Sequence, residues 1–75
     1  MNRHWERAHY STALVRNDVE GSTALELRRG DAGVVARLVF WDAAGQFYLD
    51  SVHGELPLDI VAELIAEARA SIPVK

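Results

Sequence analysis

The sequence of 75 residues contains no cysteine, two prolines and a single lysine, Lys75. Without cysteine the chain forms no disulfide and offers no thiolate to a metal, and this composition fits a reducing cytoplasm. No stretch approaches the roughly 20 apolar residues of a membrane-spanning helix, and residues 1–30 contain no apolar signal core. We therefore expect a cytoplasmic protein that makes no contact with a membrane.

Positive charge is also scarce. Eight lysine and arginine residues stand against eleven acidic residues, which gives a net charge of −3 at pH 7. Strong non-specific binding to nucleic acid usually needs a basic surface, so this balance disfavours it but leaves room for a local basic patch. A chain of this length forms one domain and buries only about 60% of its unfolded surface, so a monomer would be marginally stable.

Motifs for catalysis and for metal or phosphate binding are absent as well. The glycines match no phosphate-binding loop, and His4 and His9 lack the neighbouring carboxylates or thiolates of a metal site. Ser51, His53 and Glu55 alternate near the end of a strand, which does not place a base between its partners, and no nucleophile elbow is present. We therefore predict a non-enzymatic protein that uses no cofactor and no metal.

The most informative stretch that is present runs from Pro57 to Ile72 and has the pattern of a long amphipathic helix. Pro57 suits the first helical position, and Pro73 ends the helix. On a helical wheel, five residues form the centre of the apolar stripe: Leu58, Val61, Ile65, Ala68 and Ile72. Ile60 and Leu64 widen the stripe on one side, and Ala62 and Ala66 widen it on the other.

The resulting apolar arc of roughly 240° is wider than the roughly 100° that faces a single core. It therefore predicts a second contact, made either by a loop or by another chain. The alternative is that the alanines inflate the arc and that the larger side chains face one ordinary core.

Four short segments separated by turn residues precede the helix, a pattern typical of an antiparallel meander. They comprise residues 9–16, 22–29, 34–41 and 46–52. Residues 1–8 are polar apart from Trp5 and are expected to form a flexible arm, or a short turn pinned by Trp5, and residues 73–75 a C-terminal tail. The predicted fold class is α+β: a four-stranded antiparallel β-meander followed by one C-terminal α-helix packed on one sheet face, over residues 9–72.

The loop from Asp42 to Gly45 sets the register of the last two strands if it is tight. The facing pairs are then Trp41 and Gln46, Phe40 and Phe47, Val39 and Tyr48, Leu38 and Leu49, and Arg37 and Asp50. The residues expected under the helix are Leu14, Leu25, Leu27, Ala36, Leu38, Phe40, Phe47 and Leu49. A slip of one residue would exchange the two faces of the sheet.

The opposite sheet face would carry Val35, Val39, Trp41 and Tyr48, an apolar patch of the kind that marks an interface. We therefore predict homodimerisation, through this face or through the flank of the helix that carries Ile60 and Leu64. The other outcomes are shielding by the arm with Trp5, or binding of another protein or a small ligand.

Arginines on the same face suggest a different partner. Arg28 and Arg37 beside Trp41 and Tyr48 make single-stranded nucleic acid the alternative ligand, because bases stack on aromatic rings and arginines contact phosphates.

The order of four antiparallel strands and one helix, over about Tyr10 to Ile72, resembles the transcriptional-coactivator family that binds single-stranded DNA as a dimer. The resemblance is one of architecture and implies binding of single-stranded DNA as a dimer. Stretches rich in lysine and glycine are absent here, so no residue role is transferred.

Overall fold

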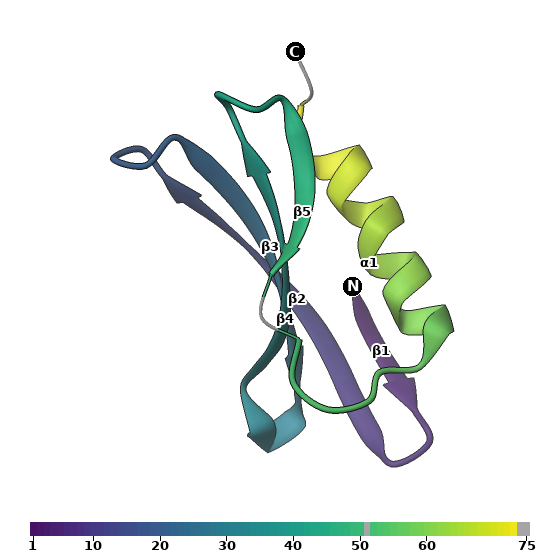
Figure 1. Cartoon of the computed structure of the whole chain (residues 1–75). Coiled ribbons are helices and arrows are strands. Elements are labelled where there is room, and N and C mark those ends of the chain that lie inside the picture. Colours follow the sequence, from purple (N-terminus) through teal and green to yellow (C-terminus); the bar gives the residue numbers. More distant parts are fainter. Residues whose placement is uncertain (51, 74–75) are drawn as a thin grey trace.

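The structure is a computed structural model and describes residues 1–50 and 52–73. One antiparallel sheet of five strands, ordered as in the chain, is covered on one face by a helix (Figure 1). The elements are β1 (Asn2–Trp5), β2 (Ala8–Asn17), β3 (Ser22–Arg29), the 3₁₀ turn η1 (Gly30–Ala32), β4 (Val34–Trp41), β5 (Gln46–Asp50) and α1 (Leu58–Ser71). The predicted α+β class with a C-terminal helix is confirmed, with five strands instead of four.

The additional strand is β1, which occupies the place of the predicted flexible arm. It pairs with β2, with Arg3 opposite Tyr10, and the Trp5 side chain packs against the core. Glu6 and Arg7 form the turn between these strands, and Glu6 has a positive φ of 51°. The prediction of a flexible arm was wrong because the turn lacks the Asn-Gly or Asp-Gly signal that usually announces a tight hairpin.

The register of the β4–β5 hairpin is as predicted. Trp41 faces Gln46 at the loop, and Arg37 faces Asp50 at the far end. The amide of Gly45 donates to the carbonyl of Trp41 at 2.8 Å, and Gly45 has the positive φ, 66°, that glycine adopts without strain. β5 ends at Asp50, before the predicted end at residue 52, and Ser51 lies outside the described residues.

A β-bulge changes the place of one predicted residue. Leu27 faces Ala36 and Arg28 faces Val34, so Val35 is the extra residue on β4. The Val35 side chain is only 2% exposed and belongs to the core cluster. Its predicted place on the open sheet face was therefore wrong, because strict alternation along a strand does not anticipate a bulge.

Helix α1 lies over β3 and β4 and buries a different stripe from the one expected. The buried residues of this stripe, each at most 1% exposed, are Ile60, Leu64, Ala68 and Ile72. Leu58 and Ile65, predicted at its centre, are 83% and 41% exposed. The helix is therefore rotated by roughly 60° from the prediction at 100° per residue.

The prediction that Ile60 and Leu64 form an interaction surface was wrong, because in this orientation of the helix both are core residues. The wide arc could not show which of its parts faces the sheet. With 14 residues, α1 is shorter than the roughly 20 residues that cross a bilayer. No helix in the described part of the chain could therefore span a membrane.

Candidate interaction surface

Most of the exposed large apolar side chains lie at the β5 edge of the sheet and on α1. Among the described residues, eight large hydrophobic side chains are exposed. Five of them belong to β5, the link after it and α1: Tyr48, Leu49, Val52, Leu58 and Ile65. The other three, Leu14, Val15 and Val19, lie at the end of β2 and in the loop that follows.

The position of α1 explains why β5 is left uncovered. Polar contacts hold the helix toward the other side of the sheet, where Arg3 pairs with Glu63 and the Thr12 hydroxyl donates to Glu67 at 2.5 Å. A helix is about 10 Å wide and strands lie about 4.8 Å apart, so one helix covers only two to three strands. Leu49 is consequently 56% exposed on the face that α1 was expected to cover.

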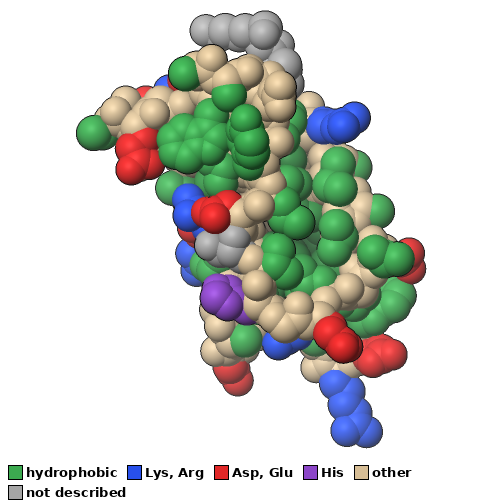
Figure 2. Space-filling view, viewed as in Figure 1, with side chains coloured by type: hydrophobic (Ala, Val, Ile, Leu, Met, Phe, Trp, Pro, Cys, Tyr) green, Lys and Arg blue, Asp and Glu red, His purple; other side chains and the backbone are tan. Residues whose placement is uncertain are grey.

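Between β5 and α1 lies a recess that carries hydrophobic side chains on both sides (Figure 2). From β5 come Leu49 and the partly buried Phe47, whose ring lies 5.1 Å from that of Phe40. From α1 come Val61 and Ile65, on the flank away from the contacts of Glu63 and Glu67. We call these four residues, Phe47, Leu49, Val61 and Ile65, the β5–α1 groove.

Sequence reasoning did not anticipate this groove, although one signal was available. The last strand of a meander is an edge strand, and a single helix cannot reach every strand of a sheet of this width. The helix pattern in the sequence does not, however, show which edge of the sheet the helix lies nearer.

The predicted patch on the opposite sheet face is present but less open than expected. Val39 faces Tyr48 on one side and Ala24 on the other, so these residues share that face. Val39 and Ala24 are only 3% and 2% exposed, and Trp41 is partly buried. Tyr48, at 46% exposure, is the one large side chain of the predicted patch that is freely accessible among the described residues.

The two arginines predicted for this face are paired with carboxylates. Arg28 donates to Glu26 at 3.3 Å, and Arg37 donates to Asp50 at 3.3 Å and lies 3.9 Å from Glu26. The predicted Arg37–Asp50 pair is thus present. Because two carboxylates neutralise the two guanidinium groups, this face has little positive potential for a phosphate.

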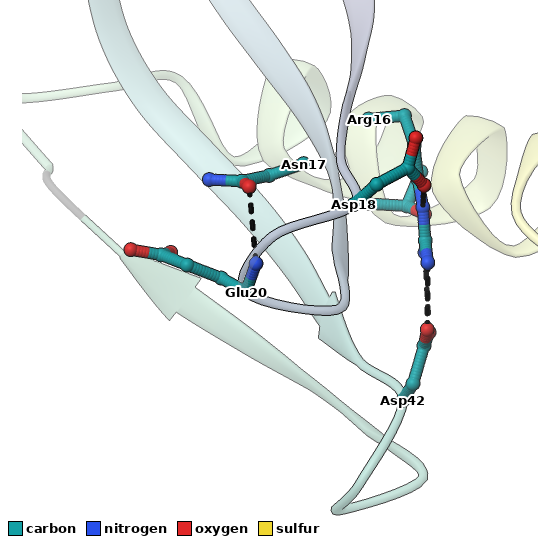
Figure 3. Close-up of polar contacts among 6 residues, drawn as sticks. Arg16, Asn17, Asp18, Glu20 and Asp42 are labelled. Carbon is teal, nitrogen blue, oxygen red and sulfur yellow. Dashed lines mark hydrogen bonds and ion pairs between the residues drawn. The ribbon is translucent and has the colours of Figure 1, made fainter.

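A separate polar cluster joins the two hairpin loops (Figure 3). The guanidinium of Arg16 donates to Asp42 at 2.8 Å, to Asp18 at 2.9 Å and to Thr23 at 2.9 Å. The hydrogen bond to Asp42, followed by that to Asp18, raises the pKa of Arg16 above its usual range. No local sequence pattern predicts this cluster, because Arg16 and Asp42 lie in different hairpins.

Beside this cluster is a cavity of about 410 Å³ at the end of α1. Its lining residues are Arg16, Thr23, Phe40, Asp42, Gly45, Ile72 and Pro73. The guanidinium of Arg16 is already engaged by Asp18, Asp42 and Thr23. The lining is mixed, because polar side chains stand beside Phe40, Ile72 and Pro73.

Residues suited to metal binding or catalysis are not brought together in the part of the chain that the structure describes. No group of three or more histidine or acidic side chains could hold a metal ion within residues 1–50 and 52–73. His4 and His9 lie side by side on β1 and β2, with ring centroids 4.4 Å apart. His53 and Glu55 are exposed, and Ser51 lies outside the described residues.

Comparison with known proteins adds no relative: no family model, no curated protein and no solved structure matches the chain.

Proposed function

We propose that this protein is a small, non-enzymatic interaction module that acts as a homodimer, with the β5–α1 groove at its interface. The observation that carries the proposal is the exposure of two residues of the β5–α1 groove, Leu49 on β5 at 56% and Ile65 on α1 at 41%. Full burial of a leucine or isoleucine side chain is worth about 1.5–3 kcal/mol relative to exposure. A second copy that covers the groove therefore stabilises a domain too small to cover it alone.

Sedimentation equilibrium over a concentration series tests the proposal. We expect the wild type to dimerise and Leu49→Lys to raise the dissociation constant at least about tenfold, because the ammonium would have to be buried in an apolar contact. Leu14→Lys is the matched control. Leu14 is 53% exposed and lies in the same row of facing residues as Leu25, Leu38 and Leu49.

The two variants separate the possible results. A wild type that stays monomeric at every concentration would remove the homodimer. A dimer that is broken by Leu14→Lys and not by Leu49→Lys would move the interface to the free end of β2 and exclude the β5–α1 groove.

Binding of single-stranded nucleic acid through the open sheet face is the second candidate. In its favour, Arg37 lies on the same sheet face as Trp41 and Tyr48. The pairing of Arg28 and Arg37 with carboxylates counts against it. A titration with oligo-dT that quenches tryptophan fluorescence more strongly at low salt would support this candidate, and an unchanged signal would exclude it.

A further inference from the structure

We propose that the two copies join by antiparallel pairing of β5 with β5 of the second copy, about a two-fold axis at Tyr48. The two five-stranded sheets then form one continuous sheet. This inference rests on the proposed homodimer. It adds that β5 forms the contact, that the two strands run antiparallel, and that their register is centred on Tyr48.

The first argument is that β5 is an unprotected edge. Proteins usually blunt an edge strand with proline, lysine, a bulge or a covering element. β5 has neither proline nor lysine, its register with β4 is unbroken over five residue pairs, and α1 does not cover it. Its one charged residue, Asp50, already pairs with Arg37.

The other terminal strand, β1, is more strongly protected. It is four residues long, Arg3 at its centre is engaged with Glu63, and the turn after it carries Glu6 and Arg7. Charged side chains and short length discourage pairing with another chain. Of the two terminal strands of the sheet, β5 is therefore the one that suits a second copy.

Symmetry then restricts the register. A two-fold axis perpendicular to the sheet makes the paired strands antiparallel and keeps both helices on one face. Facing residues must therefore both lie on the helix side or both on the other side. Centring the axis on Tyr48 satisfies this condition and is the arrangement that pairs all five residues of β5.

The side chains of this register are complementary. On the helix side, Phe47 of each copy faces Leu49 of the other, so the grooves of the two copies share one apolar floor. On the opposite side Tyr48 faces its own counterpart, and Gln46 faces Asp50, an amide donor opposite a carboxylate. Like charges that face each other in an antiparallel pair are destabilising, and this register contains no such pair. Centring the axis on Leu49 instead would set each Tyr48 against Asp50.

A single introduced cysteine tests this register, because the chain contains no other cysteine. Facing residues of antiparallel strands have Cα atoms about 4.5–5.5 Å apart, which is within the about 4.4–6.8 Å that a disulfide spans. We expect Tyr48→Cys to form disulfide-linked dimers under mild oxidation as its main product. Leu49→Cys should cross-link several-fold more slowly, because Leu49 faces Phe47 and not itself.

Val19→Cys is the control for disulfides that form by random collision between copies, because Val19 is 97% exposed in the loop after β2. If the protein sediments as a dimer and Tyr48→Cys cross-links no faster than Val19→Cys, the β5 pairing is overturned while the homodimer stands. If the protein is monomeric, both are overturned.

Amide hydrogen exchange on the wild type gives an independent reading that does not depend on how a variant folds. The amides of β5 should exchange at least several-fold more slowly as the protein concentration rises, while the amides of β1 should not change. Protection of β1 in place of β5 would overturn the inference.

Discussion

At the scale of single residues, Glu67 shows how one carboxylate fixes the position of α1. The carboxylate accepts hydrogen bonds from the Thr12 hydroxyl and from the amino group of Met1, both of which lie on the β1 and β2 side of the sheet. Burial raises the pKa of Glu67, but the hydrogen bonds from Met1 and Thr12 outweigh it and lower the pKa below 4.5 overall. The charged form is therefore the one that stabilises the fold.

This direction predicts a pH dependence of stability. Because the pKa of Glu67 is lower in the folded state, its contribution is complete above about pH 4.5 and is lost as the pH falls through the lowered value. Glu67→Gln should lower the free energy of unfolding by about 1 kcal/mol at pH 7 and flatten its pH dependence below about pH 5. Urea unfolding at pH 7 and at lower pH measures both effects.

Glu63→Gln is the control for this prediction. Glu63 is 46% exposed and pairs with Arg3 at the surface, where such a pair contributes about 0–1 kcal/mol. A Glu67→Gln variant with the same pH profile as the wild type would show that the carboxylate is not held as described.

At the scale of elements, the decisive feature is the rotation of α1 about its axis. Contacts of Glu63 and Glu67 turn one acidic flank toward β1 and β2, and this sets Ile60 and Leu64 on the sheet. The same rotation turns Ile65 away from the core and toward the uncovered strand β5. One orientation thus determines both the core and the candidate interface.

Two leucines of α1 check this orientation. Leu64→Ala should lower the free energy of unfolding by about 2–5 kcal/mol, because Leu64 is fully buried and its removal leaves a cavity. Leu58→Ala should change it by no more than about 0.5 kcal/mol, since Leu58 is 83% exposed. Chemical denaturation compares the two at low protein concentration, and equal losses would contradict the described face of the helix.

At the scale of the whole molecule, the width of the sheet exceeds what its helix covers. Five strands are joined in one layer, while α1 packs mainly on β3 and β4. Hydrophobic side chains therefore remain exposed along β5 and on the near flank of α1 (Figure 2). The proposed homodimer follows from this mismatch.

Association should appear in the thermal stability. If a second copy binds the folded state alone, the melting temperature rises with protein concentration. Each 1 kcal/mol shifts the melting temperature of a domain of this size by about 4–8 °C, so an about hundredfold rise in concentration should produce a shift of several degrees. Scanning calorimetry measures it. Leu49→Lys should remove the dependence, and a dependence that survives in this variant would place the contact elsewhere.

The sequence by itself determined the features that depend on neighbouring residues. β3 and β4 begin and end where the pattern of turns predicts, and the loop from Asp42 to Gly45 set the register of β5 on β4. A tight loop leaves few ways for its flanking strands to pair, so local chemistry is sufficient there.

Tertiary packing decided the rest. Leu64 faces the sheet and Ile65 does not, in an orientation that also brings Glu63 to Arg3 and Glu67 to Thr12, residues distant from them in the chain. The bulge at Val35 and the pairing of β1 depend likewise on the strands beside them. Hydrophobic periodicity shows which residues are apolar, but it does not show which of them are buried. Burial depends on how the elements pack together, and the exposure of Leu49 is a result of that packing.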